Sequence, residues 1–362
     1  MLFQRSARSA AALFGFLYCL AFAAQAQQQA AAKLPNVTIL ATGGTIAGTG
    51  ATSTTTVGYT AATVGVQALI QAVPEITRVA NVTGEQVFQI ASENMGNEHW
   101  LTLAKRVNVL LAQSNVDGIV ITHGTDTLEE TAYFLNLVVK SKKPVVVVGS
   151  MRPSTALSAD GPINLYNAVI LAGSQEAVGR GVLVALNDQI QSARDVTKTN
   201  TTTADTFKAT ELGMLGYMQG GKPYFYRSPT RKHTVETEFD VSSLSVLPQV
   251  EIAYAHANVG PVAVEALVAS GAKGLVHAGV GNGSLPAKVR PALSAARKKG
   301  VIIVRSSRVG QGIVARNGEA NDDELDFVAG DNLSPQKARI LLMLALTKTT
   351  NTKDIQKMFG TY

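Results

Sequence analysis

The chain has 362 residues, of which 46% are hydrophobic and 16% charged, a composition typical of a well-packed globular protein and not of a disordered one. Its length suffices for two ordinary domains or one large domain. The formal net charge at pH 7 is +6, but the basic residues are scattered in runs no longer than Arg297-Lys298-Lys299, so we expect no nucleic-acid partner.

The first 26 residues have the pattern of a signal peptide. Arg5 and Arg8 precede the apolar stretch AAALFGFLYCLAFAA, which is too short for a transmembrane helix, and the tripeptide AQA then supplies the small residues of a cleavage site. We expect residues 1–26 to be removed near Ala26, leaving a mature protein without a membrane anchor. Cleavage also removes Cys19, the only cysteine, and with it any disulfide, thiol nucleophile or thiolate metal ligand.

Residues 34–227 are expected to form the larger, N-terminal α/β domain, because short apolar runs alternate there with segments of helical period. The expected strands are residues 36–40, 86–90, 118–122, 144–149 and 181–186. The expected helices are residues 65–73, 98–113, 127–139 and 164–173. The runs other than 86–90 are continuously apolar, which predicts a mostly parallel sheet buried on both faces.

A polar segment with two prolines, residues 228–248, interrupts this alternation and is expected to be an interdomain linker. Beyond it, residues 249–362 predict a smaller C-terminal α/β domain. Its expected strands are residues 249–255, 274–280 and 301–307, and its expected helices are residues 260–270, 285–300 and, closing the chain, about 335–347.

Four of the expected strands end in polar residues, which is where open α/β sheets bind ligands. These ends carry Thr42, Gly43, Gly44 and Thr45; Ser92 and Glu93; Thr122, Thr125 and Asp126; and Asp195 and Lys198. The glycines at 43, 44 and 48 fit neither the dinucleotide fingerprint nor the phosphate loop, and no Lys follows Gly48. We interpret Gly43-Gly44 as a sharp turn at the end of a strand.

Two interpretations of Thr125, Asp126 and Lys198 stay open on the local pattern. A lysine that is partly neutral could activate a threonine hydroxyl, directly or through a water. Alternatively, Asp126 or Thr127 caps the following helix, with Glu129 in its first turn, and Lys198 is a solvated loop lysine. The local pattern alone favours this second, structural interpretation.

The five histidines give no sign of a metal site or a serine triad, because none are paired at metal-ligand spacing and no G-x-S-x-G elbow is present. His123, which lies beside the Thr-Asp pair, is expected to be structural. We expect no metal and no cofactor.

Two stretches, ILATGGTIAG (residues 39–48) and DGIVITHGTDTLEETAYFL (residues 117–135), resemble the two signatures of bacterial L-asparaginases. The resemblance runs from about residue 34 to 362 and includes GSMRPSTALSADGP, RDVTKTNTT, AGVGNGS and LSPQKARILL. Together with the signal peptide it indicates the periplasmic, type II branch of this family, and in particular its glutaminase-asparaginase members.

The resemblance implies an amidohydrolase that converts L-glutamine and L-asparagine to the acid and ammonia through a threonine acyl-enzyme. Thr45 matches the nucleophile, and Tyr59 matches a tyrosine on a mobile lid loop that hydrogen-bonds it. Thr125, Asp126 and Lys198 match a second catalytic group, and which base activates which threonine stays open.

The resemblance also implies how the substrate is held. Ser92, Glu93, Thr125 and Asp126 match residues that bind its α-carboxylate and α-ammonium groups. Ser284 and Glu319 match residues that complete the site of a neighbouring subunit, so a homo-oligomer is expected, in the form of a tetramer built as a dimer of dimers. Strict asparaginases usually carry glutamine at the position of Glu93 and asparagine at that of Ser284, and both departures resemble the dual-specificity members.

A periplasmic amino-acid-binding protein is the alternative from another class, since it too would be exported, two-domain and α/β. Such a protein would have no need of Thr45 presented beside Thr125, Asp126 and Lys198.

Overall fold

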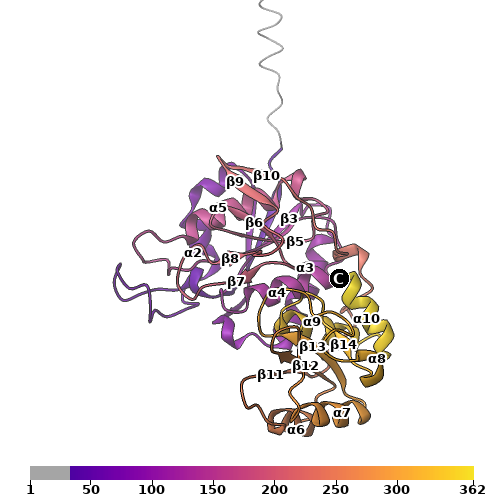
Figure 1. Ribbon diagram of the computed structural model, residues 1–362. Helices are drawn as coiled ribbons and strands as arrows, with labels where there is room; N and C mark the ends of the chain where they lie inside the picture. The colour runs from indigo at the N-terminus through magenta and orange to yellow at the C-terminus, as the bar shows by residue number, and fades with distance from the viewer. Residues whose placement is uncertain (1–32) are drawn as a thin grey trace, which may run out of the picture. The chain divides into compact units, whose positions relative to one another are not determined.

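The computed structural model describes residues 33–362 (Figure 1), so the predicted signal peptide lies outside the described residues. Pro35–Tyr362 form one compact unit in which two sheets organise two α/β domains. Within the described residues, none of the helices combines the length and the apolar content that a membrane crossing requires.

The larger sheet has eight strands in the order β10-β9-β6-β5-β4-β3-β1-β2. They are β1 (Asn36–Gly43), β2 (Asn81–Ile90), β3 (Gly118–Thr122), β4 (Val145–Val148), β5 (Val182–Leu186), β6 (Gln189–Ser192), β9 (Gly216–Gln219) and β10 (Lys222–Phe225). The strands from β2 to β5 pair in parallel, and β6, β9 and β10 add an antiparallel extension. The expectation of a mostly parallel sheet is therefore confirmed.

Helices cover both faces of this sheet, which explains why its central strands are apolar without interruption. The helices are α2 (Val66–Gln71), α3 (Asn97–Leu111), α4 (Leu128–Val138) and α5 (Gly161–Ala172). Leu40 belongs to the core on the side of α3 and α4, whereas its neighbour Ile39 belongs to the core on the side of α2 and α5. Short 3-10 helices lie at Thr45–Ala47, Pro74–Arg78, Ser92–Asn94, Gln175–Ala177 and Thr234–Glu236.

The smaller domain contains a parallel four-stranded sheet, β11-β12-β13-β14. Its elements are β11 (Val250–Tyr254), α6 (Val262–Ala269), β12 (Gly274–Gly279), α7 (Arg290–Lys298), β13 (Ile302–Ser307), α8 (Asp322–Leu325), β14 (Val328–Ala329), α9 (Pro335–Ala345) and α10 (Thr352–Thr361). Helices α6 and α7 pack on one face of the sheet.

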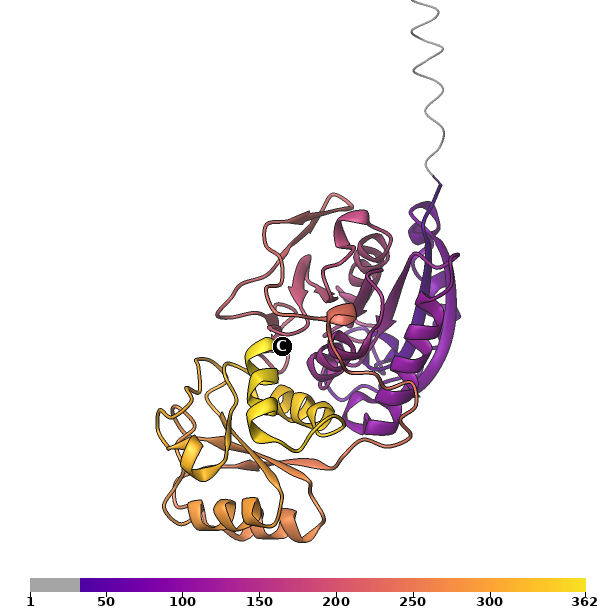
Figure 2. The same cartoon turned by 90° about the vertical axis from the view of Figure 1, so that its right-hand side faces the viewer.

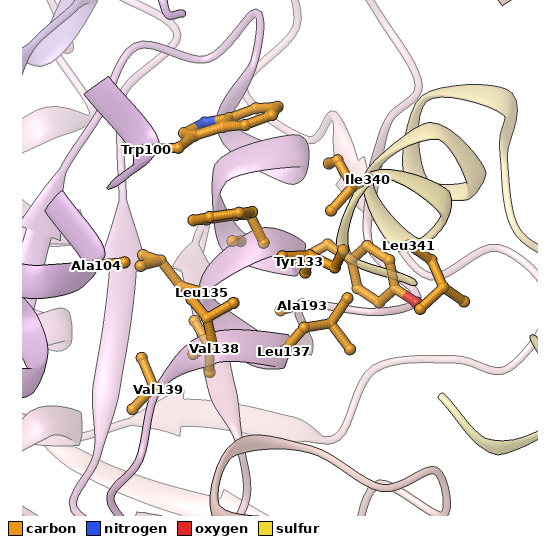
Figure 3. Close-up of a cluster of buried hydrophobic side chains, with 14 of the residues drawn as sticks. Trp100, Ala104, Tyr133, Leu135, Leu137, Val138, Val139, Ala193, Ile340 and Leu341 are labelled. Carbon is orange, nitrogen blue, oxygen red and sulfur yellow. The ribbon is translucent and has the colours of Figure 1, made fainter. Parts of the chain in front are cut away.

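Helix α9 covers the other face and joins the two domains. It packs against β11, β12 and β13 and also against α4 of the larger domain, as the yellow C-terminal helices in Figure 2 show. Figure 3 shows this junction, where Ile340 and Leu341 of α9 lie beside Tyr133 of α4. One continuous hydrophobic core therefore extends from the larger domain through α9 to the smaller sheet.

Several sequence expectations differ from the structure, among them the strand expected over 86–90, which begins at Asn81. The helix expected over 285–300 begins only at Arg290, because Pro291 lacks an N–H and is tolerated only in a first turn. The helix expected to close the chain is followed by α10, which begins after Asn351. Residues 189–192, expected in the polar loop after β5, form strand β6.

Candidate active site

A cavity of about 320 Å³ opens where β1, β2 and β3 end. These strands are neighbours in the sheet, so the polar residues that follow them meet at one edge. Every residue expected in one subunit's site lines this cavity: Thr45, Tyr59, Ser92, Glu93, Thr125, Asp126 and Lys198.

Two consecutive glycines carry the chain from β1 to Thr45. Gly43 and Gly44 have φ values of 110° and 82°, which L side chains rarely adopt, so the predicted glycine turn is confirmed. A Cβ on Gly44 would also lie 2.2 Å from Cα of Gly124, so the loops after β1 and β3 can touch only through glycine. The neighbouring Thr42 is structural, since its hydroxyl donates to the carbonyl of Thr122 at 2.9 Å.

Thr45 begins a short 3-10 helix and is only 6% exposed. Its Oγ1 lies 2.7 Å from the hydroxyl oxygen of Tyr59. Tyr59 ends a loop whose base is closed by two backbone hydrogen bonds between Thr49 and Thr60. The same loop is held from outside, because the N–H of Gly50 donates to Oγ1 of Thr155. Thr45 is thus covered by a loop that brings a second hydroxyl to it.

Thr125, Asp126 and Lys198 form a second hydrogen-bonded group in the cavity. Nζ of Lys198 lies 3.0 Å from Oγ1 of Thr125 and 2.6 Å from Oδ1 of Asp126. The Lys198 side chain is only 17% exposed, so the interpretation as a solvated loop lysine is wrong. The helix-cap interpretation is right in position only: Thr127 is the N-cap residue of α4 and Glu129 lies in its first turn, but the Thr127 hydroxyl makes no capping bond and donates to the carbonyl of Ser92. Asp126 binds the lysine instead of capping the helix.

Ser92 and Glu93 lie in the 3-10 turn after β2. Oγ of the buried Ser92 accepts the N–H of Asp126 at 3.2 Å, which leaves the serine proton free for another acceptor. Glu93 is exposed at the rim. The cavity therefore offers two carboxylates, suited to an ammonium group, and a hydroxyl donor, suited to a carboxylate.

His123 supports the site from behind, as a fully buried ring. The indole Nε1–H of Trp100, which can only donate, binds Oγ1 of Thr131 at 2.9 Å. The Thr131 hydroxyl therefore keeps its own proton to donate to Nε2 of His123, also at 2.9 Å. Nδ1–H of His123 donates to the carbonyl of Gly124 at 2.7 Å, which orients the peptide before Thr125. Burial lowers the pKa of His123 to about 4, so the ring is neutral at pH 7. The expectation of a structural histidine is confirmed.

Ser284 and Glu319 lie in the smaller domain and do not line the cavity. Oγ of Ser284 is 3.4 Å from Oε2 of Glu319. Their two loops are joined by the buried Arg305, whose guanidinium pairs with Asp322 at 2.6 Å and donates to the carbonyls of Asn282, Gly283 and Ala315. Sequence reasoning missed Arg305, which follows the apolar half of β13 (Ile302–Ser307) and carries no motif of its own.

Comparison with known protein families agrees with this geometry. Residues 36–231 match the family model described as asparaginase, N-terminal, and residues 249–359 match that of the glutaminase/asparaginase C-terminal domain. The chain belongs to the asparaginase family. Membership makes it an amidohydrolase and disfavours the alternative of an amino-acid-binding protein.

Two curated asparaginase-family proteins and one solved structure illustrate the similarity. The chain is 56% identical over 342 residues to the glutaminase-asparaginase of Pseudomonas fluorescens biotype A, covering 94% of each chain. It is 56% identical over 329 residues to L-asparaginase 2 of Bacillus subtilis, covering 91% of this chain and 87% of that one. The crystal structure of a probable cytoplasmic L-asparaginase from Campylobacter jejuni matches with a TM-score of 0.88 and 50% identity, covering 91% of this chain and 100% of that one.

In this asparaginase-family chain the cavity presents two threonine hydroxyls in different environments. The hydroxyl of Thr45 lies beside the phenol of Tyr59, whereas the hydroxyl of Thr125 lies beside Nζ of Lys198, which also binds the Asp126 carboxylate. The arrangement can therefore supply a nucleophile from one side and charged groups for proton transfer from the other.

Proposed function

We propose that the protein hydrolyses the side-chain amide of L-glutamine and L-asparagine to the acid and ammonia. The observation that carries this proposal is the convergence of Thr45–Tyr59 and Thr125–Lys198–Asp126 on a single cavity. The names of the relatives, glutaminase-asparaginase and L-asparaginase 2, support both substrates. Release of ammonia on adding either amino acid to the purified protein tests it, and binding without release would favour the amino-acid-binding protein.

In the proposed reaction, Oγ1 of Thr45 attacks the side-chain amide carbon. The threonine proton passes to a base, and the carbonyl oxygen becomes an oxyanion that backbone N–H groups near Thr125 stabilise. The C–N bond then breaks, the nitrogen takes up a proton, and ammonia leaves an ester on Thr45. Water attacks this ester, releases the acid and restores the hydroxyl. Each proton transfer stays within the two hydrogen-bonded groups and the attacking water.

Thr45 is assigned as the nucleophile in preference to Thr125. The support is its buried position beneath the Tyr59 loop, whose hydroxyl can accept or relay the threonine proton. Trapping with an electrophilic glutamine analogue, followed by mass spectrometry of the adduct, tests this assignment. A label on Thr125 instead of Thr45 would reverse the two roles.

The substrate's α-ammonium and α-carboxylate groups are assigned to Ser92, Glu93, Thr125 and Asp126. We further propose that glutamine and asparagine are hydrolysed with comparable efficiency, on the basis of Glu93 and of Ser284. The ratio of kcat/KM for the two substrates is the measurement. A preference for asparagine of about a hundredfold or more, equivalent to 2.7 kcal/mol in transition-state binding, would contradict dual specificity.

The active form is proposed to be a homo-oligomer, most simply a tetramer built from dimers, in which Ser284 and Glu319 complete the neighbour's cavity. Their absence from the lining of their own chain's cavity supports this arrangement. Subunits carrying Thr45→Ala and subunits carrying Glu319→Ala should each be poorly active alone, yet mixed oligomers should regain activity. Failure of mixed oligomers to regain any activity would place Glu319 in its own subunit's site or outside any site.

Export to the periplasm is proposed from the pattern of residues 1–26, with cleavage near Ala26. The mature protein is proposed to comprise an N-terminal domain over 34–227, a linker over 228–248 and a C-terminal domain over 249–362. N-terminal sequencing of protein recovered from the periplasmic fraction tests both export and the cleavage position. An N-terminus at Met1 on active cytoplasmic protein would contradict the proposal.

A further inference from the structure

The segment that carries Lys198 lies outside the two main sheets. β7 (Thr197–Lys198) pairs with β8 (Phe207–Lys208) in a small two-stranded sheet of its own. The backbone N–H of Lys198 donates to a side chain instead, Oε2 of Glu129, at 2.8 Å. The placement of the lysine therefore depends on contacts made by other elements.

Glu129 joins three elements through one buried carboxylate. It lies in the first turn of α4, is only 5% exposed, and receives Lys198 N–H on Oε2. Its other oxygen, Oε1, accepts Nε2–H of Gln336 on α9 at 2.7 Å. A carboxylate held from both sides in this way has little freedom to rotate, so it fixes the backbone of Lys198 relative to α4 and α9.

The next residue of α9 holds the chain just before Lys198. Lys337 is 3% exposed, and its Nζ donates to the carbonyls of Arg194, at 2.8 Å, and of Val196. Burial lowers the pKa of Lys337 to about 8, while the neighbouring Glu129 carboxylate counteracts part of that effect. Burying an amine against two backbone carbonyls is unfavourable unless these bonds are formed, so they hold residues 194–196 firmly.

We propose that Glu129 is a positioning residue for Lys198 and that, with Gln336 and Lys337, it keeps Nζ of Lys198 on Thr125 and Asp126. The inference rests on the catalytic role of Lys198 proposed above. It makes α9, which belongs to the smaller domain, part of the machinery that aligns the site in the larger domain. Nζ of Lys198 is 3.0 Å and 2.6 Å from its two partners, so a backbone shift of one ångström breaks one or both bonds.

The test is a double-mutant cycle on the full-length enzyme with glutamine as substrate. Glu129→Ala should lower kcat by about 30- to 100-fold, because misplacing a catalytic group by an ångström costs about that much, while KM changes by less than about threefold. In a Lys198→Ala background, the same Glu129→Ala change should lower kcat by less than about threefold, because the group that it positions is gone.

Two further variants separate positioning from a loss of folding. Glu129→Gln keeps an oxygen that accepts the N–H of Lys198. Rotation of the Gln336 side-chain amide by 180° then presents its oxygen to the new amide N–H and keeps the bond to α9. This variant should therefore retain most of the wild-type kcat. Gln336→Ala removes only the contact to α9 from a half-buried position and should lower kcat about 3- to 10-fold with KM unchanged. Thermal unfolding of each variant checks that it is folded.

A Glu129→Ala enzyme that retains kcat within threefold of wild type overturns the proposal. Equal losses in the wild-type and Lys198→Ala backgrounds also overturn it, because Glu129 would then act independently of Lys198. If Lys198→Ala itself retains full kcat, the proposed role of Lys198 fails, and the positioning proposal fails with it for that separate reason.

Discussion

The hydroxyl oxygens of Tyr59 and Thr45 lie 2.7 Å apart, although Tyr59 belongs to a surface loop and Thr45 is almost fully buried. The loop base is fixed by the pairing of Thr49 with Thr60, whereas Val57 near its tip is 73% exposed. Tyr59 therefore reaches the proposed nucleophile from a segment that is exposed over much of its length, although Gly50 and Ser53 are hydrogen-bonded to Thr155 and Leu157. Such loops close over a substrate and exclude water from the reaction.

Tyr59→Phe should lower kcat for glutamine by about 100-fold, the usual contribution of one proton-transfer group. KM should change little, because the ring still fills the same space over the cavity. Tyr226→Phe is the matched control, since Tyr226 is 75% exposed and lies outside the cavity lining, and it should leave both constants unchanged. A Tyr59→Phe enzyme with wild-type kcat would show that the phenol takes no part in the chemistry.

Gly44→Ala should abolish activity and destabilise the fold for two separate reasons. The φ of 82° with ψ of −168° costs about 1–3 kcal/mol for a residue with a Cβ, and the Cβ would meet Cα of Gly124 at 2.2 Å, which forces apart the loops that carry Thr45 and Thr125. Gly179→Ala is the control, because Gly179 has a similar φ of 75° but open space around it. Urea unfolding should show a loss of about 1 kcal/mol for Gly179→Ala and several times that for Gly44→Ala. Equal losses in the two variants would show that the contact with Gly124 is unimportant.

Much of this site could be predicted from the sequence because Thr45, Ser92 and Thr125 each follow an apolar run. Their strands β1, β2 and β3 are adjacent in the sheet, so residues that look alike along the chain meet in space. Lys198 is different, since its partner Thr125 is 73 residues away and β7 has only two residues. The local pattern offered Lys198 as a candidate but favoured a solvated loop lysine, and only the resemblance to a family favoured a catalytic role.

The elements that sequence analysis missed, among them β6, β9, β10 and α10, also depend in part on contacts between distant residues, although β6 and α10 left signals in the sequence. Asn187 and Asp188, with φ of 52° and 58°, form the turn from β5 to β6, and this pair of residue types that tolerate positive φ, directly after an apolar run, is a turn signal. Asn351 caps α10 by accepting the N–H groups of Lys353 and Asp354, which is a recognisable helix start. The pairing of β6 with β9 and β10 depends on tertiary contacts that no local pattern contains.

Acidification should destabilise the protein through His123. Its pKa of about 4 in the folded protein lies below the ordinary value of 6.5, so between these values the unfolded chain binds more protons than the folded one. The stability that His123 contributes is fully present above pH 6.5 and declines as the pH falls toward 4, by about 3 kcal/mol in all. NMR titration of the His123 imidazole in the folded protein measures its pKa, with the exposed His256 as an internal control. Titration of His123 near pH 6.5 in the folded protein would contradict the prediction.

Among the ion pairs of the described residues, the pair of Arg305 with Asp322 should be the one whose loss most destabilises the smaller domain. Both side chains are 0% exposed, and the guanidinium donates to three backbone carbonyls besides the carboxylate. Arg305→Met leaves Asp322 buried without its cation and should lower the free energy of unfolding by about 3–5 kcal/mol. Adding Asp322→Leu to this variant should recover part of the loss, because no unpaired charge then remains.

Urea unfolding at one fixed protein concentration measures the stability of the single and the double variant, since oligomerisation would otherwise shift the midpoint. Lys357→Met, which removes a pair whose lysine is 78% exposed, is the control and should unfold at the wild-type midpoint. A double variant no more stable than Arg305→Met would indicate that the lost carbonyl bonds dominate over the unpaired carboxylate.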